Sequence, residues 1–261
     1  MANFNAPENI AETVIEKVGT KKCQLGMMQV IILGILAGAF IAFGAQLATR
    51  VMTGIETFGL RVFLGGAVFS VGLMLVVIAG AELFTGNNLI MMSVLAGKKK
   101  FSTMLGYWVV VYFANLVGSL LIVWFMHMAG LVSGAVGETA VGIASSKANL
   151  PFVQVFFRGI LCNWLVCLAV WLALASHDIP GKILGIFFPI MAFVASGFEH
   201  SIANMYFIPM GMILDSSITF GGFINNLAAS TIGNIVGGAG FVATIYYLVF
   251  RKCTVNIAPG K

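Results

Sequence analysis

Two short segments of the sequence place titratable and amide side chains inside long apolar runs. Glu82 is followed by Asn87 in the first segment and Glu199 by Asn204 in the second, so both read Gly-x-Glu-x-x-x-x-Asn. His200 comes directly after the second glutamate. Because histidine titrates near neutral pH, His200 could lend a proton to a weak-acid anion and later recover it. The alternative interpretation is a buried histidine held in a hydrogen-bond network.

The repeated glutamates and asparagines predict a shared structural task. An interrupted helix leaves backbone amides free, and Glu82, Glu199, Asn87 and Asn204 are predicted to accept hydrogen bonds that stabilise the interruption. A proton relay between the glutamates and His200 is the alternative.

Three further polar residues are candidates for contact with an anion. The Thr85 hydroxyl could donate to an anion at a narrow point, or it could bond back to a helix carbonyl. Asn163 could offer a second donor. Lys147, in a predicted outer loop before the fourth apolar run, could attract anions toward an entrance.

The composition indicates where these residues must lie. The chain of 261 residues is 60% hydrophobic and 9% charged, whereas soluble domains carry about a quarter of their residues as charges. This excludes a soluble enzyme, a nucleic-acid-binding module and a disordered chain. Six runs are long enough to cross a lipid bilayer, namely Leu25–Ala48, Phe63–Ala96, Met104–Gly130, Phe152–Ala175, Lys182–Leu214 and Phe223–Phe250. The predicted fold class is an all-α polytopic membrane protein.

The distribution of lysine and arginine predicts the orientation of the spans. Ten basic residues fall on the side of the two termini, and only Arg50, Arg61, Lys147 and Arg158 fall on the other. Because basic residues tend to remain in the cytoplasm, both termini are expected there. The ten are Lys17, Lys21, Lys22, Lys98, Lys99, Lys100, Lys182, Arg251, Lys252 and Lys261. The net charge of +5 therefore indicates topology, and no nucleic-acid partner is expected.

Comparison of the two halves predicts an internal repeat. Besides the glutamate segments, two further pairs match in order at a nearly constant interval: Gly34–Gly38 with Gly159–Asn163, and Asn115–Gly118 with Asn234–Gly237. Three spans per copy is an odd number, so the copies must be inverted in the membrane. Their second elements, the second and fifth helices, are predicted to be broken. Such breaks are tolerated only beside protein or a water-filled cavity.

These boundaries predict three parts of the chain. Residues 1–24 form a cytoplasmic amphipathic segment, residues 25–250 form the pore domain with repeats over 25–130 and 152–250, and residues 251–261 form a cytoplasmic tail. Within the first part, Ile10, Val14, Ile15 and Val18 share one helical face. That segment is expected to lie on the membrane surface or to plug an opening. The four cysteines, Cys23, Cys162, Cys167 and Cys253, lack ligand spacing, so no disulfide, metal or cofactor is expected.

The two polar segments resemble the signature segments of the formate/nitrite transporter family. The matching residues run from Gly80 to Asn87 and from Ala195 to Met205, and those from Asn163 to Ala169 and from Thr231 to Gly238 fit the fourth and sixth spans of that family. The resemblance implies an aquaporin-like protomer with its own pore, a homopentamer in the bacterial inner membrane, and passage of small monovalent anions.

The resemblance also implies roles for individual residues. His200 matches the central histidine of the family, Thr85 the threonine of its mobile loop, Asn163 its pore asparagine and Lys147 its vestibule lysine. The apolar constrictions of the family correspond to Phe69, Leu73, Phe84, Val166 and Phe193.

A weak acid could avoid much of the cost of dehydration by crossing as a neutral molecule after protonation at the constriction, with the proton exchanged at His200. Hydrosulfide is the first expected substrate, followed by formate and nitrite, whereas chloride is too weak a base. A membrane enzyme is not expected, because His200 has no partner histidine one helical turn away and no Gly-x-Ser-x-Gly motif occurs. A neutral-solute facilitator of the aquaporin type is the alternative function.

Overall fold

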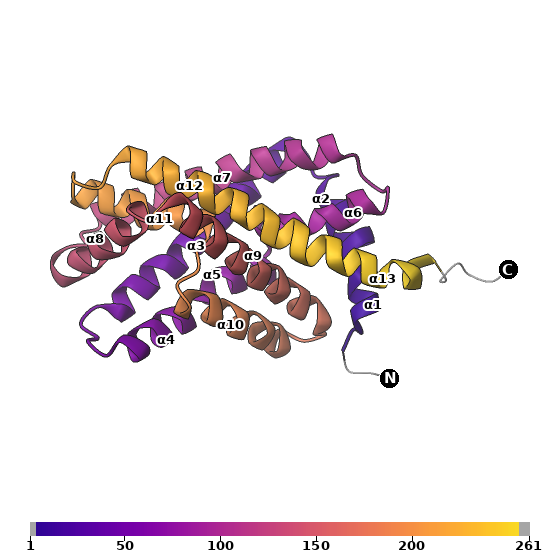
Figure 1. Ribbon diagram of the computed structural model, residues 1–261, viewed down its shortest axis with the longest axis horizontal. Helices are drawn as coiled ribbons and strands as arrows, with labels where there is room; N and C mark the ends of the chain where they lie inside the picture. Colours follow the sequence, from indigo (N-terminus) through magenta and orange to yellow (C-terminus); the bar gives the residue numbers. More distant parts are fainter. Residues whose placement is uncertain (1–3, 256–261) are drawn as a thin grey trace.

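The computed structural model describes the backbone of residues 4–255 and the side chains of residues 4–251. Within that part all regular structure is helical, and the one β-type pairing is an isolated bridge between Phe4 and Ser176. The helices form an elongated bundle with α13 at one end and α8 at the other (Figure 1). Lys261, much of the expected tail and the side chains of Lys252 and Cys253 lie outside the described residues.

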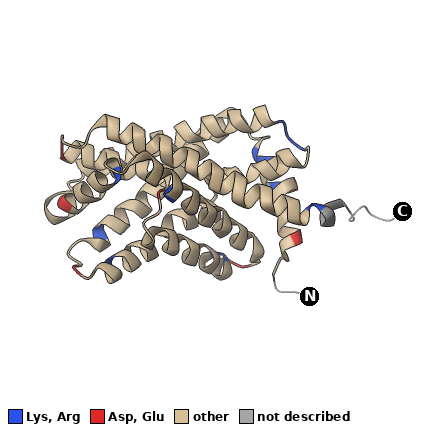
Figure 2. Cartoon of the chain, viewed as in Figure 1, with Lys and Arg blue, Asp and Glu red and all other residues tan. Residues whose placement is uncertain are grey.

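Five helical stretches are long and apolar enough to cross a membrane. They are α3 (Met27–Met52), Phe58–Gly80, α7 (Phe101–Met128), α9 (Phe152–Ala175) and Phe220–Arg251. The second comprises α4 (Phe58–Phe69), α5 (Val71–Met74) and the π-helical η2 (Leu75–Gly80), and the last comprises α12 (Phe220–Ile235), the π-helical η4 (Val236–Thr244) and most of α13 (Ile245–Val255). Most charged residues lie toward the two ends of the bundle (Figure 2).

The two predicted breaks interrupt helices at equivalent glycines. The stretch Phe58–Gly80 ends at Gly80, whose φ is +91°, and the chain becomes helical again at η3 (Gly86–Ile90) and α6 (Met91–Leu95). The expected run Lys182–Leu214 consists of two shorter helices, α10 (Ile179–Ala195) and α11 (Ser201–Leu214), separated near Gly197 with φ +72°. A glycine at positive φ ends a helix without the steric cost of a Cβ atom.

One helix was not expected. The segment before the fourth span, predicted as a loop, forms α8 (Gly134–Ala148), with Lys147 in its last turn. Its residues are mostly small, and Glu138, Ser145, Ser146 and Lys147 interrupt the apolar ones, so it lacks the long apolar run that marks a membrane span. This helix covers one end of the bundle and turns Lys147 inward, where only 17% of its side chain is exposed.

The N-terminal segment packs against protein. It forms α1 (Pro7–Thr13), the π-helical η1 (Val14–Gly19) and α2 (Thr20–Lys22). Its buried residues Ile10, Ala11, Val14 and Ile15 belong to an apolar cluster with Leu89, Met92, Cys167, Trp171, Val242 and Ala243. The apolar face is therefore covered by the bundle and is not available to a membrane surface.

Glycines bring the long helices into backbone contact. A Cβ atom on Gly118 of α7 would overlap the carbonyl oxygen of Ile35 in α3, and one on Gly237 would overlap that of Ile160 in α9. Gly34 and Gly38, and likewise Gly233 and Gly237, form Gly-x-x-x-Gly pairs that serve such contacts within the protomer.

Gly118→Ala is expected to destabilise the protein by about 1–3 kcal/mol, because the new methyl group overlaps a backbone atom that cannot move alone. Gly106→Ala in the same helix is the matched control, since no atom lies within 4 Å of its added Cβ. This control should be neutral or more stable by up to about 1 kcal/mol. Unfolding in mixed detergent micelles measures both variants, and equal stability of the two would contradict the packing described here.

Candidate functional site

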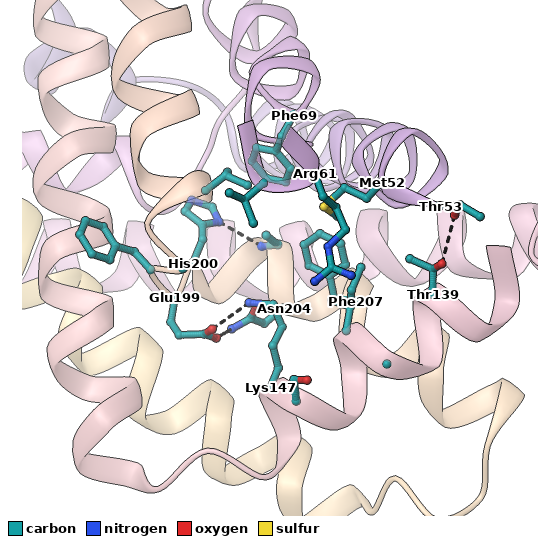
Figure 3. Close-up of a pocket in the computed structure, with 18 of the residues that line it drawn as sticks. Met52, Thr53, Arg61, Phe69, Thr139, Lys147, Glu199, His200, Asn204 and Phe207 are labelled. Carbon is teal, nitrogen blue, oxygen red and sulfur yellow. Dashed lines mark hydrogen bonds and ion pairs between the residues drawn. The ribbon is translucent and has the colours of Figure 1, made fainter. Parts of the chain in front are cut away.

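A cavity of about 900 Å³ lies between α8 and the segment where α10 meets α11. Side chains from α4, α8, α10 and α11 line it, and Lys147, Glu199, Asn204 and His200 lie along one wall (Figure 3). Phe69, Phe193 and Phe207 supply its aromatic lining. The cavity therefore combines a charged wall, centred on Lys147 and Glu199, with an aromatic one. Further lining residues are Phe198 and the charged Glu56, Arg61, Glu138 and Arg158.

His200 is held in one orientation by two hydrogen bonds. It caps the start of α11, where its Nδ1 accepts the backbone N–H of Ala203 at 3.0 Å, and its Nε2 lies 2.9 Å from Oγ1 of Thr85. Because the Nδ1 lone pair is occupied, the neutral ring must carry its proton on Nε2 and donate it to the Thr85 hydroxyl. The hydroxyl hydrogen of Thr85 then remains free for an acceptor. Two residues from different breaks thus meet.

This geometry opposes the hypothesis that His200 is charged and transfers a proton. An imidazolium ring carries hydrogens on both nitrogens, so a second proton on Nδ1 would displace the amide of Ala203. In the observed arrangement His200 is a hydrogen-bond donor.

The predicted constriction residues are all buried in one apolar cluster. Phe69 meets Phe193 edge to face with ring centroids 5.7 Å apart, and the Phe193 ring stacks on His200 at 5.9 Å. Phe69 also stacks on Phe207, which sequence reasoning missed because an aromatic residue in an apolar run carries no distinguishing pattern. Leu73, Phe84 and Val166 are likewise buried but do not line the cavity.

A buried ion pair forms the centre of the charged wall. Lys147 Nζ lies 2.9 Å from Glu199 Oε1, and Asn204 Nδ2 donates to Glu199 Oε2 at 2.7 Å. Asn226 donates to the same oxygen at 3.2 Å and to the backbone oxygen of Lys147 at 3.0 Å. The carboxylate is 3% exposed, so its charge is balanced by lysine and two amides rather than by water.

A matching ion pair lies at the first break. Lys22 Nζ is 2.9 Å from Glu82 Oε2 and 2.8 Å from Asn87 Oδ1, and Asn87 Nδ2 donates to Glu82 at 2.9 Å. Lys22 was counted only as a topology signal. The signal that could have found it is spacing, because Lys22 precedes Gly34 by the same interval as Lys147 precedes Gly159.

The free backbone groups of the two breaks are bonded by other asparagines. Asn115 Oδ1 accepts the N–H of Phe84 at 3.0 Å, while its Nδ2 donates to the oxygens of Gly34 and Glu82. Asn234 makes the equivalent bonds to Ser201, Gly159 and Glu199. Within the described residues, the side chains of Glu82 and Glu199 bond to lysine and asparagine side chains instead of the predicted backbone amides.

Asn163 also differs from its predicted role as a donor in the pore. Its amide nitrogen donates to the backbone oxygens of Thr85 at 3.2 Å and Asn234 at 2.7 Å, which occupies both of its hydrogens. Asn163 therefore joins the first break to α12 and fixes the backbone of Thr85.

The bundle has long apolar helices, two of its helices are interrupted, and its cavity ends on buried polar residues. These features are typical of a membrane transport protein. The family model described as Formate/nitrite transporter matches residues 8–248, and the chain belongs to that family. It is a multi-pass membrane protein and not an enzyme.

Individual relatives agree with this assignment. The chain is 45% identical to an uncharacterized transporter of Bacillus subtilis (strain 168), with 95% of each chain covered. It is 44% identical to a formate channel of Bacillus thuringiensis, covering 97% of this chain and 99% of that protein. A solved structure described as a pentameric formate channel with formate bound is 36% identical with a TM-score of 0.77, covering 86% of this chain and 98% of that one.

Proposed function

We propose that this protein passes formate and related weak acids across the membrane, and that the substrate crosses the apolar constriction as the neutral acid. The observation that carries the proposal is the buried Thr85–His200 pair, which offers hydrogen bonds but no net charge where the cavity meets the aromatic rings. A bare anion would lose its hydration there at a cost of several kcal/mol. A neutral acid would lose far less.

In the proposed transport, Lys147 attracts the anion and the aromatic rings admit only the neutral acid. The lysine raises the local concentration of the anion within the cavity, where the anion can take a proton from water. The rings of Phe69 and Phe193 exclude water and ions from the next step. His200 then donates its Nε2 hydrogen bond to the substrate instead of to Thr85. The Thr85 hydroxyl can donate a hydrogen bond to the same molecule as it moves inward.

The choice of substrate rests on the relatives. Formate channels are among them, and the family name includes nitrite, so formate takes first place in this proposal and nitrite second. Hydrosulfide, ranked first from sequence, remains a candidate to be tested, because its protonated form is also a small neutral molecule with a hydrogen to donate.

The remaining parts of the proposal concern assembly and orientation. The repeated hydrogen bonds of Asn115 and Asn234 support six spans in two inverted repeats, as does the bond of Tyr112 to Thr231, its counterpart by the same alignment, at 2.8 Å. The pentameric solved relative supports a homopentamer. The basic residues favour cytoplasmic termini in the cell membrane of a bacterium.

Proteoliposomes containing an internal pH dye test the proposed function. With formate outside, the lumen is expected to acidify, and at constant total formate the rate should fall about tenfold per pH unit, because the acid form becomes scarcer as pH rises. Nitrite, hydrosulfide, acetate and chloride complete the panel, with chloride expected to be inactive. Formate flux without acidification, driven instead by membrane potential, would contradict neutral crossing, and equal swelling in glycerol would favour the neutral-solute facilitator.

A further inference from the structure

Four buried side-chain atoms lack a hydrogen-bond partner among the described residues: Oδ1 of Asn88, Oη of Tyr107, Oγ of Ser201 and Oδ1 of Asn204. Of these four residues, only Asn204 lines the cavity. A buried acceptor without a partner is uncommon and costs about 1–3 kcal/mol unless a water or ligand satisfies it. Asn204 therefore has an unpartnered acceptor, itself fully buried, beside the cavity.

The orientation of the Asn204 amide is fixed by its neighbours. Its nitrogen donates to Glu199 Oε2 and to Asn226 Oδ1, both at 2.7 Å. Exchange of its oxygen and nitrogen would place the oxygen against two acceptors, so the observed orientation is the favourable one. The amide thus holds Oδ1 as an acceptor and has no hydrogen left to donate.

Comparison with the first break shows that this acceptor is left open at one break only. There, Oδ1 of Asn87 accepts from Lys22 at 2.8 Å, so lysine and asparagine satisfy each other. In the cavity, Lys147 bonds to Glu199 alone among the described side chains, which leaves two ammonium hydrogens for another acceptor. Lys147 and Asn204 bind opposite oxygens of one carboxylate, so a residue with an unused donor and a residue with an unused acceptor flank Glu199.

We infer that Asn204 Oδ1 and Lys147 Nζ form a binding site for the protonated form of a weak acid. The acid would donate its O–H or S–H hydrogen to Asn204 and accept from Lys147. A chloride or nitrate ion satisfies only the lysine, and its charge is repelled by Asn204 Oδ1 and Glu199. This inference rests on the proposed function and adds a residue that selects the acid over anions of strong acids before the constriction.

The test compares formate with nitrate in proteoliposomes carrying Asn204→Leu. The KM for formate is expected to rise roughly three- to tenfold, the change that corresponds to one neutral hydrogen bond, while the inhibition constant of nitrate stays unchanged. Asn226→Leu is the matched control, because it removes another donor to the same carboxylate. It also frees one Asn204 hydrogen, but the bond from Asn204 Nδ2 to Glu199 remains and keeps Oδ1 in its orientation. In that control the formate and nitrate constants should move together. If Asn204→Leu changed the KM for formate and the inhibition constant of nitrate by the same factor, the inference would be wrong. Water would then be the partner of Asn204 Oδ1.

Infrared spectroscopy of ¹³C-formate bound to the wild-type protein provides a second measurement that needs no variant. At a pH slightly above the pKa of free formic acid, a carbonyl band of bound protonated acid is expected, and a carboxylate band alone would contradict the site. The failure of the proposed function would look different, because wild-type vesicles would then show no uptake of formate at all.

Discussion

We expect His200→Phe to lower formate flux by about a hundredfold. The phenyl ring has a width similar to that of imidazole, but it has no hydrogen-bond donor at the end of the cavity. A loss of this size is typical when one preorganised donor is removed from a water-excluding site. His200→Gln should recover much of the flux, since the amide nitrogen of glutamine can occupy the position of Nε2. Formate-dependent acidification of proteoliposomes measures both variants.

The glutamine variant separates the two roles considered for the histidine. Glutamine donates hydrogen bonds but does not titrate, so an active His200→Gln protein with the wild-type pH dependence would show that hydrogen bonding suffices. If His200→Gln were as inactive as His200→Phe, proton exchange at the imidazole would be required and the Nδ1 bond to Ala203 would have to open during transport. Retention of the oligomer on size-exclusion chromatography is the control for folding.

Lys147→Met is expected to destabilise the protein by about 3–5 kcal/mol, because it leaves the buried carboxylate of Glu199 without its cation. The double variant Lys147→Met, Glu199→Gln should recover part of this loss, since it removes both charges together. Formate flux should remain low in both, as neither contains the cation that attracts the anion. Unfolding in mixed micelles gives the free energies and completes the double-mutant cycle.

Lys98→Met is the matched control for this prediction. Lys98 also pairs with a glutamate, Glu16, at 2.9 Å, but the two side chains are 49% and 44% exposed. Exposed pairs contribute about 0–1 kcal/mol, so this variant should unfold almost like the wild type. Equal losses for Lys147→Met and Lys98→Met would contradict the role of burial.

Much of the architecture could be predicted from sequence because a bilayer restricts the possibilities. Long apolar runs located α3, α7, α9 and the stretch Phe220–Arg251 to within a few residues, and α9 has the predicted bounds, Phe152–Ala175. The two runs that contain a break matched less closely, because each run continued across its break. The breaks were found because Glu82, Glu199 and His200 are costly in lipid and stand out against their surroundings. Helix α8 was missed because its sequence has neither property.

The detailed roles were harder to predict because they depend on which hydrogens and lone pairs are already used. Asn163 has the residue type of a pore donor, yet both of its amide hydrogens bond to backbone oxygens. Glu82 and Glu199 could have accepted backbone amides, but Asn115 and Asn234 reach those groups from neighbouring helices. Such competition between partners is decided in three dimensions, and spacing along the chain does not reveal it.

The docking of the N-terminal segment has a consequence for biosynthesis. Ile10 and Val14 leave the ribosome well before Val242 and Ala243, but all four belong to one apolar cluster, and the later two lie in the span Phe220–Arg251. Until that span is inserted, the N-terminal segment lacks part of its binding surface and its apolar face stays open to water or chaperones. Ile10 and Val14 are therefore synthesised early but reach their native environment late, and a chain truncated before α12 would leave them exposed as a recognisable mark of incomplete assembly.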